Sequence, residues 1–66
     1  MKVFVNGEMR ELANGTTIAM LVAALDLAGR RVAVEVNEEI VPKAVHAQTL
    51  LRDNDRVEIV HAIGGG

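Results

Sequence analysis

The sequence predicts an α+β domain in which a single helix packs across a mixed sheet of four or five strands. Three features of the 66-residue chain lead to this prediction. Short segments alternate apolar and polar residues, as strands with one buried face do. One segment between them repeats apolar residues at the spacing of an amphipathic helix. Turn-forming pairs rich in asparagine and glycine separate these segments.

The first two strands are predicted to form a hairpin near the amino terminus. Residues 2–5, KVFV, alternate in the manner of a strand and are followed by Asn6-Gly7. This pair favours a hairpin turn because both residues tolerate a positive φ. The returning strand is then expected from Met9 to Leu12.

The helix is predicted after a second turn at Asn14-Gly15, with Thr16 or Thr17 as its N-cap. Four apolar residues at positions i, i+3, i+4 and i+7 define its buried face: Ile18, Leu21, Val22 and Leu25. We expect Gly29 to end the helix, because glycine readily adopts the left-handed conformation found at helix C-termini.

A strand and a short hairpin are predicted after the helix. Residues 32–37, VAVEVN, show the cleanest alternation in the chain. Residues 38–39 are expected to form a turn, and residues 40–41 a short strand stopped by Pro42, since proline cannot donate to a strand ladder.

The last part of the chain predicts one more strand. Residues 43–51 have weak periodicity and are expected to form a loop with a short helical turn. A turn at residues 53–55 then leads into the final strand, from Arg56 to about Ala62.

Composition excludes several classes of function. The formal charge of −2 and the single aromatic residue, Phe4, argue against nucleic-acid binding, which needs a basic face or a stacking platform. The longest apolar run, Ile18 to Leu25, is too short to span a membrane, and the first residues do not resemble a signal peptide. The absence of cysteine fits a cytoplasmic protein.

Composition also argues against an active site within the chain. Cysteine and serine are both absent, so no set of nucleophile, base and orienting group is apparent. The two histidines, His46 and His61, lack the neighbouring ligands that zinc needs. We therefore expect no catalytic residue and no metal ligand.

The chain ends HAIGGG, and its last three residues carry no side-chain chemistry. The residues alone leave two interpretations open. Chain ends commonly fray, which would make the glycines incidental. Alternatively, the carboxylate of Gly66 is the functional group, and Gly64 and Gly65 let the tail pass through a narrow channel because glycine has no β-carbon.

Three segments of the chain form a recognisable pattern: residues 5–8 (VNGE), residues 36–42 (VNEEIVP) and, most specifically, residues 47–66 (AQTLLRDNDRVEIVHAIGGG). Together they resemble the ubiquitin-like β-grasp proteins, and among them the bacterial sulfur carriers of thiamine biosynthesis, the ThiS family. The resemblance implies a β-grasp domain at residues 1–62 and a flexible Gly-Gly tail at residues 63–66.

The resemblance also implies a chemistry. In that family the terminal glycine, here Gly66, is adenylated by a partner related to ubiquitin-activating enzymes (ThiF-type), which uses ATP. It is then converted to a thiocarboxylate with sulfur from a donor such as a cysteine desulfurase, and the sulfur passes to a thiazole synthase (ThiG-type). The chain itself would bind no cofactor. Gly64 stands where many ubiquitin-like tails have a side chain, which leaves the reach of the tail open.

A docking surface follows from the same resemblance. In a β-grasp sheet the first and last strands are neighbours, so Phe4 would lie beside Val60 and Ala62 on the face away from the helix. We expect these residues to form an apolar patch, close to where the tail departs, that docks a partner.

Three alternatives stay open. The small subunit of molybdopterin synthase shares the thiocarboxylate chemistry but delivers its sulfur to a pterin precursor. A ubiquitin-like modifier would instead join Gly66 to protein lysines. A passive interaction module would be unaffected by the loss of Gly65 and Gly66.

Overall fold

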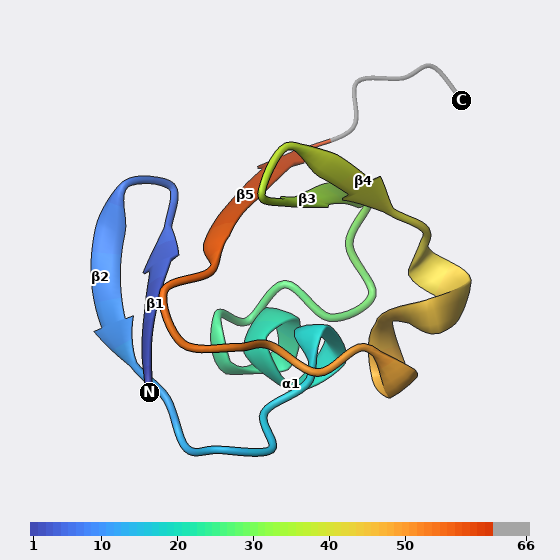
Figure 1. Cartoon of the computed structure of the whole chain (residues 1–66). Helices are drawn as coiled ribbons and strands as arrows, with labels where there is room; N and C mark the ends of the chain where they lie inside the picture. Colours follow the sequence, from blue (N-terminus) through green and yellow to red (C-terminus); the bar gives the residue numbers. More distant parts are fainter. Residues whose placement is uncertain (62–66) are drawn as a thin grey trace.

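The computed structural model describes residues 1–61 and confirms the predicted α+β architecture (Figure 1). Its elements, in chain order, are β1 (Lys2–Val5), β2 (Glu8–Glu11), α1 (Ile18–Ala24), β3 (Val32–Val36), β4 (Glu39–Val41), the 3-10 helix η1 (Lys43–Gln48) and β5 (Arg56–His61). The strands form one five-stranded sheet in the order β2-β1-β5-β3-β4. The central strand β5 runs parallel to β1 and antiparallel to β3, so the sheet is mixed.

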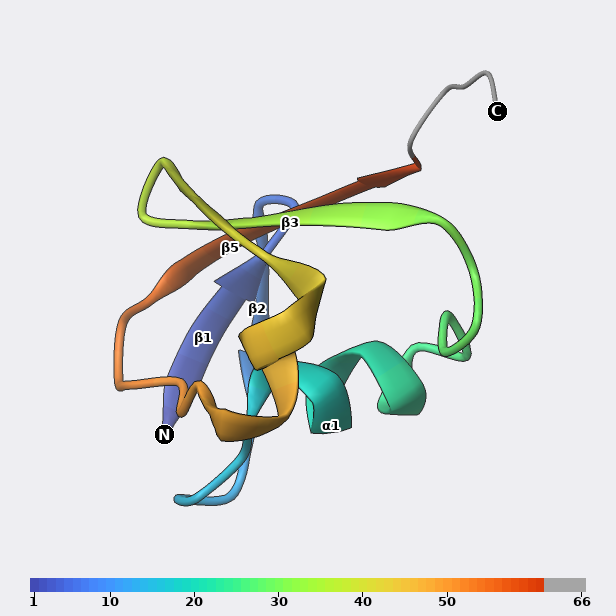
Figure 2. The ribbon, with the colours of Figure 1, turned by 90° about the vertical axis from the view of Figure 1, so that its right-hand side faces the viewer.

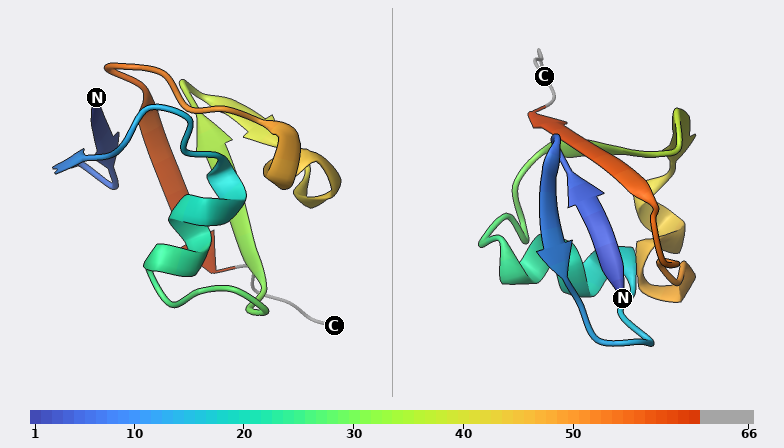
Figure 3. Two further views of the ribbon diagram at one scale, coloured as in Figure 1. Left: turned by 90° about the horizontal axis from the view of Figure 1, so that it is seen from below. Right: turned by 60° about the vertical axis from the view of Figure 1, so that its left-hand side comes forward.

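The core lies between the sheet and the helices that cover one of its faces. In Figure 2, α1 lies below the sheet, and in the left view of Figure 3, which looks from below, α1 lies in front of the sheet with η1 beside it. Alternate strand residues and one side of α1 are buried in this space: Val3, Val5, Val34, Val57, Ile59, Ile18, Leu21 and Val22, joined by Leu51. Each fully buried side chain of this kind contributes about 1.5–3 kcal/mol. No helix of residues 1–61 covers the opposite, open face.

The amino end of α1 confirms one of the two predicted N-caps. The hydroxyl of Thr17 accepts a hydrogen bond from the backbone N–H of Met20 at 3.1 Å. Thr16 lies in the preceding turn, where its hydroxyl donates to the carbonyl of Ala13 at 2.7 Å. Because the side-chain oxygen of Thr17 satisfies a free N–H of the first turn, the helix start is well defined.

The carboxyl end of α1 differs from the prediction. The helix ends at Ala24, and Gly29 lies in a later turn. Asp26, with a φ of 63°, adopts the left-handed conformation expected of glycine. The N–H of Leu27 then donates to the carbonyl of Val22 at 3.0 Å, which is the long hydrogen bond of a Schellman motif. The early end was not apparent because aspartate is an infrequent residue at this position.

Each hairpin turns on an asparagine in the left-handed conformation. Asn6 and Asn37 have φ values of 50° and 52°. The second turn is therefore Asn37-Glu38 and not residues 38–39 as predicted, because asparagine tolerates a positive φ, and Glu39 already begins β4. The first hairpin turns at Asn6-Gly7 as predicted, and β2 begins one residue early, at Glu8.

The same two asparagines bind the backbone of β5. The amide Nδ2 of Asn6 donates to the carbonyl of Ile59 at 3.1 Å, and its Oδ1 accepts the N–H of Ile59 at 2.8 Å. On the other side of β5, Oδ1 of Asn37 accepts the N–H of Arg56 at 2.9 Å. The side chains thus continue the strand pairing past the points where β1 and β3 end.

The segment expected as a loop is mostly one short helix. The 3-10 helix η1 follows Pro42, and its residue His46 is buried. Nε2 of His46 donates to the carbonyl of Val41 at 2.8 Å, which ties η1 to the end of β4. Neither η1 nor α1 has the length and apolar character needed to cross a membrane.

Candidate functional site

The site predicted from the sequence combines the glycine tail with a docking surface at its base. Ala62 and residues 64–66 lie outside the described residues. Of the surface residues, Phe4 is in β1 and Val60 is in β5. Because Val3 and Val5 are buried, and strand side chains alternate, Phe4 points to the open face. Val60, which follows the buried Ile59, points to the same face.

The strand register shows that Phe4 and Val60 are not neighbours, so this part of the prediction was wrong. Phe4 pairs with Arg56, and Val60 pairs with Ala33 of β3. Val60 lies four positions beyond Arg56 along β5, which at about 3.3 Å per residue is roughly 13 Å. The physical reason is the parallel register: Phe4 pairs with Arg56 and Val5 with Val57, so β1 lies beside the first part of β5 and ends before it reaches Val60.

Side chains on the open face therefore form two separate apolar groups. Phe4 lies directly opposite Met9 of β2, which is 53% exposed. At the other end of β5, Val60 is 56% exposed and lies opposite Ala33. Each group is small, and the expected single patch is divided into two.

An acidic band lies between the two apolar groups. Glu35 of β3 is directly opposite Glu58 of β5, and these two residues line a hollow of about 230 Å³ with Glu38 and Arg56. Like charges directly opposite each other weaken an antiparallel pair. Since one arginine faces three glutamates, the band carries negative charge and suits a basic side chain of a partner.

Beside the band, the surface next to Phe4 is hollowed. A depression of about 320 Å³ is lined by Phe4, Gly7, Arg56, Val57 and Glu58. A β-carbon added to Gly7 would meet no atom within 4 Å, so the space above the turn is open. The depression is suited to an apolar side chain that lies next to a basic one. The sequence predicted that Phe4 lies on the open face but did not predict the acidic band. The only sequence signal for the band was the alternation in residues 32–36 and 56–61, which places Glu35 and Glu58 on the face opposite the buried valines.

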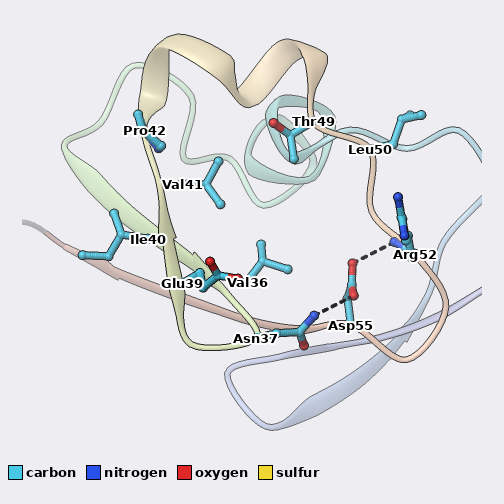
Figure 4. Close-up of a pocket in the computed structure, with 10 residues that line it drawn as sticks. All are labelled: Val36, Asn37, Glu39, Ile40, Val41, Pro42, Thr49, Leu50, Arg52 and Asp55. Atoms are coloured by element: carbon cyan, nitrogen blue, oxygen red, sulfur yellow. Dashed lines mark hydrogen bonds between the residues drawn. The ribbon is translucent and has the colours of Figure 1, made fainter.

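A larger hollow, of about 420 Å³, lies between β4 and the segment that precedes β5 (Figure 4). The carboxylate of Asp55 links two segments that line this hollow. One carboxylate oxygen accepts Nδ2 of Asn37 at 2.9 Å, and the other accepts the backbone N–H of Arg52 at 2.8 Å. The exposed Leu50 lines the same hollow. The sequence did not reveal this feature because its walls come from distant segments.

Metal-ligating residues do not gather anywhere in residues 1–61: no group of three or more His, Cys, Asp or Glu side chains there could hold an ion. The expectations of no metal ligand and no catalytic residue stay predictions for the chain as a whole.

Comparisons with known proteins point to the family that the sequence resembles. A model of the ThiS family matches residues 3–66. The chain is 47% identical over 66 residues to a thiazole synthase of Paramagnetospirillum magneticum, with 100% of this chain and 20% of that protein covered. It therefore spans about a fifth of the length of that relative. It is 30% identical over 66 residues to the sulfur carrier protein ThiS of Escherichia coli, with 100% of both chains covered.

A solved structure agrees with the fold. The crystal structure of a thiamine biosynthesis protein (ThiS) from Geobacter metallireducens matches with a TM-score of 0.85 and 32% sequence identity, and the match covers 100% of both chains. This similarity and the five-stranded mixed sheet confirm the predicted β-grasp fold.

Proposed function

This chain belongs to the ThiS family, and on that premise we propose that it is a sulfur carrier of thiamine biosynthesis whose reactive group is the carboxylate of Gly66. The observation that carries the proposal is the extent of the family match, which runs from residue 3 to residue 66 and so includes the last glycine. The proposal requires Gly66 to have a free carboxyl group. In this role the chain is a carrier and not an enzyme.

The proposed chemistry has two steps. A carboxylate oxygen of Gly66 attacks the α-phosphorus of ATP, which forms an acyl adenylate and releases pyrophosphate. A sulfur nucleophile at the oxidation level of sulfide then attacks the acyl carbon, and AMP leaves with the electrons of the broken C–O bond. The product is a thiocarboxylate, and no net oxidation or reduction occurs. Glycine suits both steps because it has no β-carbon to hinder the approaching nucleophile.

The resemblance to the family implies three partners. An adenylyltransferase of the ubiquitin-activating type binds the ATP. A donor such as a cysteine desulfurase supplies the sulfur as a persulfide, and two thiol groups reduce it to the sulfide level while they are oxidised to a disulfide. A thiazole synthase accepts the sulfur from the thiocarboxylate. The similarity of the whole chain to part of a longer thiazole synthase supports the last partner.

We further propose that the open face docks the adenylyltransferase through the two apolar groups and the acidic band. Replacing Phe4 or Val60 by alanine should raise the KM for the carrier about tenfold if they are the anchors of the interface, since the few anchor residues that dominate an interface each cost more than ~1 kcal/mol when truncated. Met20→Ala is the control, because Met20 is as exposed as Val60 but belongs to α1 on the other side of the sheet. An equal KM for all three variants would contradict docking on this face.

The proposed function is tested by the mass of the C-terminal tryptic peptide, residues 57–66. The full chain is incubated with ATP, a sulfur source and the candidate adenylyltransferase, and the peptide is then sequenced by mass spectrometry. The expected result is exchange of one oxygen for sulfur at Gly66. The peptide contains no methionine, so methionine oxidation cannot produce the shift. An unchanged peptide, with the same enzyme active on another carrier, would refute the proposal.

Two further observations separate the alternatives. A chain whose Gly66 is joined to a protein lysine would be a ubiquitin-like modifier. A thiocarboxylate that transfers its sulfur to a pterin precursor and not to a thiazole synthase reaction would indicate the small subunit of molybdopterin synthase.

A further inference from the structure

A small hollow of about 200 Å³ lies on the helix side of the molecule, away from the open face. It is bordered by α1, by the loop that follows α1 and by η1. Much of its wall consists of small apolar side chains, among them Ala19, Val22 and Ala47. Three polar side chains complete it: Arg30, Lys43 and His46. We call it the cationic hollow.

Its positive charge is not compensated locally. No acidic residue is among the residues that line it. Within residues 1–61, neither the guanidinium of Arg30 nor the ammonium of Lys43 has an ion-pair or hydrogen-bond partner. The three glutamates of the acidic band belong to the opposite face of the sheet. An anion in the cationic hollow would thus meet two cations that are free to bind it.

His46 gives the hollow a fixed wall. Its side chain is only 7% exposed, and Nε2 donates to the carbonyl of Val41 at 2.8 Å. That bond holds the ring and leaves Nδ1 without a partner among the described residues. Within residues 1–61, every side-chain nitrogen or oxygen that is fully buried has a hydrogen-bond partner. Because Nδ1 has none, it is accessible to solvent. Its chemical shift therefore reports on what enters the hollow.

From this geometry we propose that the cationic hollow is a binding site for a small carboxylate with a short aliphatic body. The two cations select an anion through charge-assisted hydrogen bonds. The apolar walls gain from burying aliphatic carbon, which phosphate and sulfate do not offer. The hollow is smaller than the roughly 300–1,000 Å³ typical of sites for drug-sized ligands, so it suits a ligand of a few carbon atoms. This inference does not depend on the proposed sulfur chemistry.

The test is a titration of the full-length, ¹⁵N-labelled chain with 3-methylbutanoate, acetate and inorganic phosphate at constant ionic strength. The ring nitrogens of His46 report binding, and those of His61 serve as an internal reference, since these are the only histidines. We expect saturable shifts at His46 for 3-methylbutanoate, with a Kd on the order of millimolar, as a ligand of this size permits. Acetate should bind roughly tenfold more weakly because it buries fewer carbon atoms. Phosphate should bind more weakly than 3-methylbutanoate.

Matched variants separate a site from general attraction. The double variant Arg30→Gln, Lys43→Gln removes both charges from the hollow and should weaken binding at least tenfold. The double variant Lys2→Gln, Arg10→Gln changes the net charge by the same amount at positions outside the hollow. This second variant should leave the affinity unchanged. Ala47→Leu should fill the hollow and abolish binding. Ala44→Leu, on the same helix η1 and also exposed but not lining the hollow, should have no effect.

No saturable shift at His46, tighter binding of phosphate, or equal weakening in the two charge variants would overturn the proposal. A blocked amino-acid derivative, N-acetyl-glutamate methylamide, distinguishes the source of the carboxylate. Binding as tight as that of 3-methylbutanoate would support the site as a receptor for an acidic side chain of a partner, and weaker binding would support a free small carboxylate.

Discussion

The double hydrogen bond between Asn6 and the backbone of Ile59 is expected to be one of the larger single contributions to the stability of the sheet. Asn6→Gly removes the bonds of 3.1 Å and 2.8 Å and keeps the backbone, since glycine readily adopts a φ of 50°. Each bond is worth about 0.5–1.5 kcal/mol, so the pair contributes about 1–3 kcal/mol. Glycine also has two opposite effects on the backbone. Its greater freedom in the unfolded chain destabilises the fold, whereas relief of the positive φ stabilises it, and we expect the two to cancel largely.

A loss of this size is easily measured in so small a domain. For 60–100 residues, ~1 kcal/mol corresponds to about 4–8 °C in the melting temperature, so Asn6→Gly should lower the Tm by roughly 5–20 °C. The assay is thermal and urea denaturation followed by circular dichroism, with the slope in urea checked for constancy.

Asn54→Gly is the matched control. Asn54 also has a positive φ, of 70°, but within residues 1–61 its side chain bonds only to the exposed neighbour Asp53, at 3.3 Å. Its replacement should change the free energy of unfolding by less than about 0.5 kcal/mol. If both variants lose the same stability, the Asn6 amide has no special role and the reasoning fails.

Three further predictions concern other parts of the fold. Asp26→Gly should raise the free energy of unfolding by about 0.3–1 kcal/mol, because it removes a negative charge from the carboxyl end of α1, where the helix dipole disfavours anions, while the effects of glycine on the backbone largely cancel as at Asn6; a lower urea midpoint would contradict this. Glu58→Gln should stabilise the sheet by about 0.2–1 kcal/mol, because it removes the repulsion between Glu58 and Glu35. This gain in the free energy of unfolding should shrink as salt is added, and a gain independent of salt would exclude an electrostatic cause. Leu21→Ala, at a side chain only 1% exposed, should lose about 2–5 kcal/mol, against a total of only ~3–5 kcal/mol for a core of this size. A cooperative melt close to that of the parent chain would show that the core tolerates the cavity.

Local features of the fold were predictable, and long-range ones were only partly so. Asn6-Gly7 located the first hairpin, and the spacing of Ile18, Leu21 and Val22 located the buried face of α1, because each signal acts within a few residues. The end of α1 was misplaced because Asp26 occupies a position where glycine is the usual residue.

The candidate site depended on strand register, which the sequence does not state. The length of each strand and the position of each turn decide which residues pair across the sheet. They pair Phe4 with Arg56, and Glu35 with Glu58. A shift of two or four residues along β5 changes which side chains share a patch while leaving the faces unchanged, because side chains alternate with a period of two. The face of Phe4 and Val60 could therefore be predicted, and their separation could not.

The place of β5 also has a consequence for synthesis of the protein. A ribosome delivers β1, β2, α1, β3 and β4 before it delivers the strand that belongs at the centre of their sheet. Until residues 56–61 emerge, the two hairpins have no common partner and the valines of β1 and β3 have no neighbour between them. Nascent chains that stop short of β5 therefore expose apolar edges to proteases and chaperones, and only translation past residue 61 yields a protected molecule.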